Sequence, residues 1–295
     1  MLYINKKVLV SDARYFTNKN AINALMNSGN KVDLDKASKE HDCILGALKK
    51  AGIKIIQVPS PKDCQDGVYV ANWAFVLNNK AILSRLPNTR KSEEPYAKKV
   101  LQKLNLDPIE MPDNVKAFSG QGDTLTCDRY IFCQSPYRSS KEAHLELQKA
   151  FPDKTILSLR TKPQRWFRIG PKKINKITGW PDSPTYDLDL ALAILKPSLN
   201  GQNCLIAYSP SRFTRKSKKL LKNLKNVDKI KVTNKETMKN YALNLVSTGE
   251  YVILNAGTTK FIQDLKKAGL KTIELDLPEL KKGGGSIRCC TLTLD

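Results

Sequence analysis

The clearest fold signal lies in residues 118–133, which read Phe118-Ser119-Gly120-Gln121-Gly122-Asp123-Thr124-Leu125-Thr126-Cys127-Asp128-Arg129-Tyr130-Ile131-Phe132-Cys133. We expect a strand that ends at the polar Asp123, followed by a hairpin of residues 124–126 and 130–133. Asp128-Arg129 forms the short turn between them. Ser140 then has the residue type that caps a helix, which we expect over residues 141–151.

The same order of strand end, hairpin and helix returns along the whole chain. Apolar strand segments end at polar residues 34 to 66 positions apart, and these residues are Asn72, Asp123, Asp189, Asn255 and Cys289. Repeated units of this kind bury their apolar faces against one another in a ring or solenoid. We therefore predict an α/β fold with one domain over residues 1–295, a five-fold α/β propeller of hairpin-plus-helix units around a central polar pocket. A doubly wound sheet is the alternative, which the hairpins disfavour.

Composition narrows the function classes. The 295 residues include seven scattered cysteines and two histidines, which form no zinc-ligand spacing. We expect free thiols, no metal and no cofactor. No window reaches the ~18 apolar residues that a membrane span needs, and the first residues lack a signal-peptide core. These features predict a cytoplasmic protein without membrane contact.

The formal net charge of +22 is high. Two runs are densest: residues 160–176, where arginines flank Trp166 and Phe167, and residues 212–225, which have the pattern of one basic helix. Arginine beside aromatic rings suits contact with phosphates and bases. A lysine-rich surface that only faces water explains the same pattern, so contact with a polyanion or nucleic acid stays open.

The C-terminal residues 283–295 contain a candidate nucleophile. Three glycines precede Arg288, Cys289 and Cys290, and glycine allows a backbone to approach a ligand closely. A thiol serves as a nucleophile where its surroundings favour the thiolate, and Arg288 could help to hold one. This segment predicts a site without specifying its reaction.

Five collinear segments together resemble one known group of enzymes. They are residues 21–42, 65–90, 118–133 and 186–189 and the terminal "GGGSIRCCTLTL". The chain resembles the guanidino-group-modifying, or amidinotransferase, superfamily with the pentein fold. That superfamily includes dimethylarginine dimethylaminohydrolases, arginine dihydrolases and arginine deiminases. The resemblance implies attack of a cysteine thiolate on a guanidinium carbon, an S-amidino intermediate, and a small guanidino compound such as arginine or methylarginine as ligand.

The resemblance also assigns candidate residues. Cys289 matches the nucleophile, and Cys290 its small buried neighbour. Asp189 matches the acidic residue of a His-x-Asp motif, and Asp66 matches a polar position of the substrate pocket. Asp123 either lines that pocket or braces its own loop.

Three positions depart from the family pattern. Asn72 stands where deiminases have an aspartate, and the dihydrolase branch also has an asparagine at this position. Ser119 stands where the family has a glutamate. Asp187 aligns with the general acid–base histidine, and it could act as the acid if burial beside Asp189 raised its pKa. His41 is expected to be structural, and His144 to face outward, so neither replaces the missing histidine.

Three functions follow from these observations. The first is a hydrolase or transferase acting on the guanidino group of arginine or an N-substituted arginine. The second is a catalytically impaired pentein that senses a ligand or binds a partner. The third is a polyanion-binding module, and whether chains pair as homo-oligomers stays open.

Overall fold

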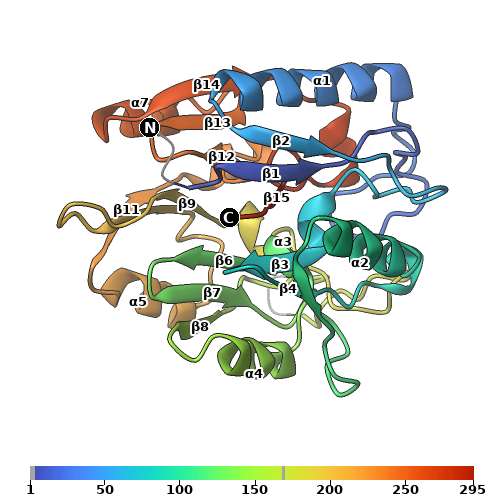
Figure 1. Ribbon diagram of the computed structural model, residues 1–295, viewed down its shortest axis with the longest axis horizontal. Coiled ribbons are helices and arrows are strands. Elements are labelled where there is room, and N and C mark those ends of the chain that lie inside the picture. The colour runs from blue at the N-terminus through green and yellow to red at the C-terminus, as the bar shows by residue number, and fades with distance from the viewer. Residues whose placement is uncertain (1–3, 168–169) are drawn as a thin grey trace.

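The computed structural model describes residues 4–167 and 170–295. It contains five three-stranded sheets (Figure 1). In chain order the strands are β1 (Lys7–Val10), β2 (Lys54–Gln57), β3 (Ala74–Leu77), β4 (Lys80–Leu83), β5 (Asp107–Ile109), β6 (Thr124–Cys127), β7 (Tyr130–Gln134), β8 (Thr155–Leu159), β9 (Leu192–Lys196), β10 (Cys204–Tyr208), β11 (Val227–Lys231), β12 (Val246–Ser247), β13 (Tyr251–Asn255), β14 (Lys271–Leu275) and β15 (Leu292–Thr293).

All five sheets have the same topology. The middle strand pairs antiparallel with the first strand and parallel with the third. A helix connects the two parallel strands, as parallel pairing requires a crossover. The crossover helices are α1 (Leu34–Lys50), α2 (Glu93–Lys103), α4 (Lys141–Ala150), α5 (Arg215–Asn223) and α7 (Thr259–Lys267).

The remaining helices are short. Most of them lie in connections that precede a first strand, and they are α3 (Gly120–Asp123), α6 (Asn234–Asn240) and the 3₁₀ turns η1 (Val70–Asn72), η2 (Asn88–Arg90), η3 (Leu188–Leu190) and η4 (Leu280–Gly283). The prediction that strands end at Asn72, Asp123 and Asp189 is therefore wrong, because the chain forms a short helical turn at each of these residues. At Gly120 φ is +53°, and an added Cβ would lie 2.6 Å from the carbonyl oxygen of Ala74.

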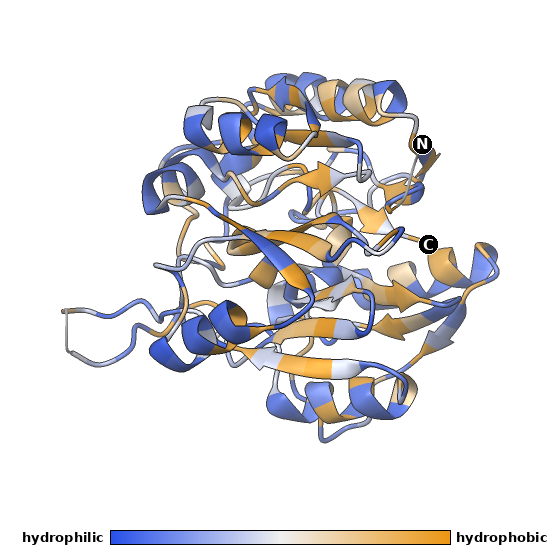
Figure 2. Cartoon of the chain, turned by 90° about the vertical axis from the view of Figure 1, so that its left-hand side faces the viewer, coloured by the Kyte–Doolittle hydropathy of each residue, from blue (hydrophilic) through white to orange (hydrophobic). Residues whose placement is uncertain are grey.

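The apolar cores join neighbouring units in a cycle. One cluster lies between β1 and the β3–β4 unit, and the next lies between the β3–β4 and β6–β7 units. Two further clusters join the β6–β7 unit to β9–β10 and β9–β10 to β12–β13. The fifth cluster closes the cycle, because it joins β13 and β14 to α1 and β1. The strands are apolar inside while the covering helices turn polar residues outward (Figure 2). The predicted five-unit α/β fold is confirmed, and β15 completes it by pairing with β1 across the sequence.

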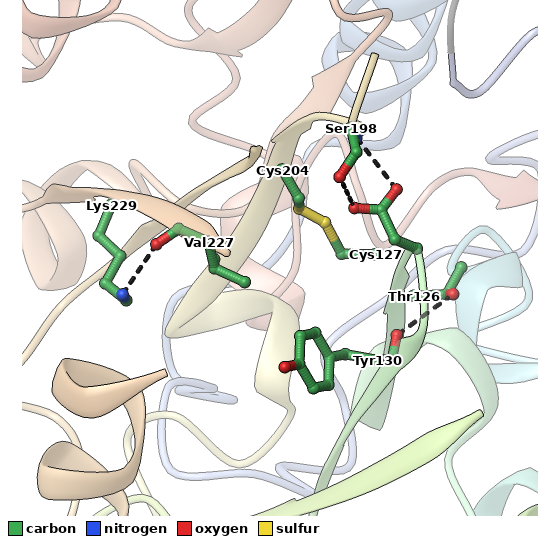
Figure 3. The surroundings of a disulfide bond; sticks show 8 residues. Thr126, Cys127, Tyr130, Ser198, Cys204, Val227 and Lys229 are labelled. Atoms are coloured by element: carbon green, nitrogen blue, oxygen red, sulfur yellow. Dashed lines mark hydrogen bonds between the residues drawn. A yellow bond between two sulfur atoms is a disulfide. The ribbon is translucent and has the colours of Figure 1, made fainter. Parts of the chain in front are cut away.

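A disulfide crosslinks two units. Cys127 at the end of β6 is bonded to Cys204 at the start of β10 (Figure 3). The expectation of free thiols is wrong for this pair, because the fold brings together two cysteines that are 77 residues apart. The Asp128 carboxylate lies within 4.8 Å of both sulfurs and accepts hydrogen bonds from Ser198. These three residues would be the candidate metal ligands here, but the two sulfurs are bonded to each other.

The basic runs lie on the surface. Trp166 and Phe167 are 59% and 77% exposed, and Lys173 Nζ lies 5.4 Å from the centre of the Trp166 ring. Arg168 belongs to this run but lies outside the described residues. Contact with a polyanion stays a prediction. Across the described parts of the chain, none of the helices is long and apolar enough to cross a membrane.

Candidate active site

Equivalent polar residues occur one to three positions before the first strand of each unit. They are Asn72, Asp123, Asp189, Asn244 and Cys289. The fourth position was expected at Asn255, which is wrong because Asn255 ends the middle strand β13. Asn244 precedes β12, whose two residues are too few to show a strand pattern in the sequence.

Asn244 brackets the candidate nucleophile. Its Oδ1 accepts from the backbone N–H groups of Ser286 (2.9 Å) and Cys289 (3.3 Å), and its Nδ2 donates to Cys289 Sγ across 3.1 Å. The glycine run lets the chain pass beside this sulfur, since a Cβ on Gly285 would lie 3.0 Å from it. Backbone and side chain of Cys289 are thus held by one amide.

The surroundings of Cys289 favour the protonated thiol. Cys289 Sγ donates to Asp189 Oδ2 across 3.3 Å. Burial, and then the negative charges of Asp189 and Asp187, raise the pKa of Cys289 well above its ordinary value. Burial and the charge of Asp187 likewise raise the pKa of Asp189. Arg288 donates instead to Thr293 Oγ1 and Gln121 Oε1, so its side chain is fixed by those two residues.

The three positions that depart from the family pattern meet in one cluster. Asn72 Nδ2 donates to Asp187 Oδ2 across 2.8 Å, and Ser119 Oγ donates to Asp187 Oδ1 across 3.0 Å. Burial raises the pKa of Asp187, while Arg138 and these two hydrogen bonds oppose the shift. Gly122 makes room for the cluster, because a Cβ there would lie 2.4 Å from Asn72 Nδ2 and 2.7 Å from Asp187 Oδ2.

Two buried arginines in the same site were missed at the sequence level. Arg90 donates to Asn72 Oδ1 across 2.8 Å and pairs with Glu93 across 2.7 Å. Arg138 lies against the rings of Trp180 and Tyr186 and donates to Ile22 O. No described residue accepts a hydrogen bond from its Nη1.

A repeated signal could have found these arginines. Each follows a middle strand and stands in a Ser- and Pro-containing connection, Ser84-Arg85-Leu86-Pro87-Asn88-Thr89-Arg90 in one unit and Ser135-Pro136-Tyr137-Arg138 in the next. A third unit has Ser209-Pro210-Ser211-Arg212. The same connection in three units would bring its arginines to one end of the fold.

The remaining predicted residues occupy two places. Asp66 lines the pocket with Cys289 and Asp187, and burial raises the pKa of Asp66 to about 6. Asp123 lies behind the pocket, where it accepts from Ser139 Oγ, Gln134 Nε2 and the backbone N–H of Leu188. These hydrogen bonds tie the η3 turn, which contains Asp189 and directly follows Asp187, to the preceding unit.

Neither histidine reaches the site. His41 is buried in α1. His144 was expected to face outward, which is wrong: it is 5% exposed, and its ring nitrogens contact Ser158 Oγ and Gln134 O. β8 packs beside α4, so the helix face with His144 is covered.

The pocket itself is almost filled. Its cavity of about 20 Å³ is lined by Cys289, Asp187, Asp66, Arg90 and Arg138, with Ile22, Asn23 and Pro87 beside them. That volume accommodates roughly one water molecule. A larger ligand can enter only if some of these side chains move.

The chain is similar in sequence to dimethylarginine dimethylaminohydrolases and arginine dihydrolases. Residues 11–153 match the family described as eukaryotic N,N dimethylarginine dimethylhydrolase. A dimethylarginine dimethylaminohydrolase of Mycobacterium tuberculosis is 26% identical over 98% of this chain and 86% of its own length. The bifunctional arginine dihydrolase/ornithine cyclodeaminase AgrE of a Nostoc species is 28% identical over 89% of this chain, and the match spans about a third of that enzyme, 34%.

Solved structures agree with the fold. The substrate-bound N-terminal domain of ArgZ, a cyanobacterial arginine dihydrolase, superposes with a TM-score of 0.81 at 23% identity, over 98% of this chain and 97% of that domain. A dimethylarginine dimethylaminohydrolase adduct superposes with a TM-score of 0.69 at 20% identity, over 99% of both chains. At these identities the structural matches establish the shared architecture.

Proposed function

The chain belongs to the guanidino-group-modifying superfamily with the pentein fold, and we propose that it is a cysteine-dependent hydrolase of the guanidino group of arginine or an N-substituted arginine. One observation carries the proposal. Cys289 Sγ lies in a buried pocket together with Asp187 and Asp66, and it contacts a third carboxyl group, Asp189. Clustered buried acids are costly unless a cation offsets them.

The pocket offers complementary groups for an α-amino acid with a cationic side chain. Asp187 and Asp66 can accept hydrogen bonds from a guanidinium or ammonium group. A planar guanidinium can donate two parallel hydrogen bonds to one carboxylate. Arg138 Nη1, which has no partner among the described residues, can donate to a carboxylate. Arg90 is held by Glu93 and Asn72 and fixes the position of Asn72.

The reaction that this arrangement supports is covalent hydrolysis. Cys289 Sγ would bond to the guanidinium carbon while its proton passes to Asp189 Oδ2, the carboxylate it already contacts. The tetrahedral adduct would expel ammonia or an alkylamine, which takes a proton back from a neighbouring carboxyl group. Water then adds to the S-amidino carbon, the C–S bond breaks, and a ureido product leaves with the thiol restored. If an amine replaced water, the same intermediate would give amidino transfer.

The substrate itself can supply the charge that activates the thiol. In the resting site two carboxylates hold the pKa of Cys289 high. A guanidinium bound between them would lower it, because an opposite charge nearby favours the ionised form. The thiolate would then form only when the cation is in place.

A second candidate function is ligand binding without turnover. It is favoured by Asp187, which stands at the position of the family's histidine and is engaged by Asn72 and Ser119. General acid–base catalysis is worth about 10²–10⁴-fold in rate, so its loss can silence an enzyme that still binds. If so, the Asp187→His, Ser119→Glu double variant should gain turnover that the parent lacks.

Product analysis tests the proposal. Purified protein is incubated with L-arginine, NG,NG-dimethyl-L-arginine or agmatine, and citrulline, ornithine, ammonia, dimethylamine and urea are measured. We expect turnover of at least one compound, its loss in Cys289→Ser, and its retention in Cys290→Ser, which changes the adjacent buried cysteine. Turnover that survives in Cys289→Ser would exclude the mechanism, and heat on titrating arginine without any product would select the second candidate.

A further inference from the structure

A second, larger cavity is lined by Asp189, the residue that also contacts the thiol, and not by Cys289 itself. It has a volume of about 300 Å³ and is lined by the first strands β3, β6, β9 and β15 and by the segment before β12. Asn5, Lys6 and Asp295 also line it, and the last two are exposed. A volume of this size lies at the lower end of small-molecule sites.

The inner wall of this cavity carries two opposite charges. Asp189 is 1% exposed, and its Oδ1 has no hydrogen-bond partner in the described parts of the protein, while Oδ2 accepts from Cys289. Arg288 lines the same cavity, held in place by Gln121 and Thr293. An acceptor without a donor in a buried wall costs free energy that a bound donor would recover.

We propose that this cavity is a second binding site, for a small uncharged molecule with an amide head and an apolar tail. The wall has no net formal charge, with Asp189 and Arg288 cancelling, so a head group with a net charge would stay uncompensated. A primary amide can donate to Asp189 Oδ1 and accept from Arg288. Phe75, Leu125 and Leu192 give part of the remaining wall an apolar surface that fits an aliphatic tail, while Thr124 and Thr126 also line it.

Occupancy of this site acts on the thiol through Asp189. A hydrogen bond to Oδ1 favours the ionised carboxylate. The charge of Asp189 disfavours the thiolate, and a donor on Oδ1 offsets part of that charge, so alkylation of Cys289 by neutral iodoacetamide should become faster as the site fills. The site therefore joins a ligand in this cavity to the reactivity of the sulfur.

Calorimetric titration of hexanamide, hexanoate and hexylamine into the protein tests the proposal. We expect saturable binding of hexanamide, at least tenfold tighter than of the two charged analogues. Thr126→Phe and Ile194→Trp place bulk at half-buried positions of the cavity wall and should weaken hexanamide binding at least tenfold. Thr155→Phe on β8 is the matched control, because Thr155 is exposed and outside the cavity, and melting temperatures verify folding.

The outcomes are decisive. No saturable hexanamide heat, equal affinity for the three probes, or unchanged affinity in both filled variants would overturn the second site. Binding is also measured in Cys289→Ser, where it should persist. If hexanamide binds as expected but arginine is not turned over, the proposed function is excluded and the second site remains. If arginine is turned over but hexanamide does not bind, the second site is excluded and the proposed function remains.

Discussion

Cys289 Sγ donates a hydrogen bond to Asp189 Oδ2 across 3.3 Å, so the candidate nucleophile rests against the carboxylate that can take its proton. The same contact suppresses the thiolate, because the charge of Asp189 raises the pKa of Cys289. Activation must therefore come with a cation.

Alkylation should depend on the charge of the reagent. At neutral pH the rate of modification by the cationic 2-chloroacetamidine is divided by the rate of modification by neutral iodoacetamide. This ratio should be at least about tenfold larger for Cys289 than for glutathione, since tenfold corresponds to one pKa unit. Asp189→Asn should speed the reaction with iodoacetamide, because the thiol pKa falls, and slow that with the amidine. Mass spectrometry of the labelled peptide measures both rates. If both reagents respond in the same direction, Asp189 does not control the thiol electrostatically.

Arginine affinity should fall in acid. Burial raises the pKa of Asp66 to about 6, so this carboxyl is charged above that pH and becomes neutral below it. If Asp66 holds the cation, the Kd for L-arginine should be constant above pH 7 and rise about tenfold per pH unit well below pH 6. Calorimetry on Cys289→Ser avoids turnover. Asp66→Asn should bind weakly at every pH, and a pH slope that persists in this variant would assign the titration to another group.

Asn72→Asp should destabilise the fold in a pH-dependent way. The new carboxyl would replace an amide that donates to Asp187 Oδ2 at 2.8 Å, and two such close acids share a raised pKa. The folded state then binds more protons than the unfolded state, so stability decreases as pH rises through the window from about 4 to the raised value. We expect a loss of about 1–3 kcal/mol at pH 8 and a smaller one at pH 5. Asn72→Ala, measured by the same urea titrations, should lack this pH dependence.

Gly122→Ala should damage the site more than the fold. The added Cβ would lie 2.4 Å from Asn72 Nδ2, so Asn72 and Asp187 must separate. Misplacement by about 1 Å costs about a hundredfold in rate, and overpacking costs about 1–3 kcal/mol. Gly46→Ala in α1 is the control, because an added Cβ there would have no atom within 4 Å apart from its chain neighbours and the backbone of its own helix. It should gain about 0.5–1 kcal/mol and keep full activity.

The Cys127–Cys204 disulfide should be measurable by thiol counting. Five of the seven cysteines are free, so Ellman titration in denaturant should give five thiols without reductant and seven after reduction. A crosslink across 77 residues contributes about 4.5 kcal/mol in the chain-entropy estimate. Cys127→Ser should lower the free energy of unfolding by about that amount, whereas Cys43→Ser, at an exposed free thiol, should not change it. Seven thiols in unreduced protein would contradict the crosslink.

Local pattern was enough to predict the buried strands. The hairpin β6–β7 and the Ser140 cap of α4 are confirmed, because continuous apolar runs, short turns and a capping serine act over neighbouring residues. The third strand of each sheet was missed. β2 has exposed residues at both ends, and β14 has exposed residues at its start and near its end. These strands therefore lack the continuous apolar run that marked the inner strands.

The sequence determined which residue types are available: a cysteine after three glycines, and acids or amides at regular intervals. Tertiary structure decided how they combine. Only the pairing of β15 with β1 and the cyclic packing of the units bring Asn244 and Asp189 to Cys289. Arg90 and Arg138 meet Asp187 in the same way. Contacts across 45 and 100 residues depend on how the units pack, and a pattern of neighbouring residues does not contain that information.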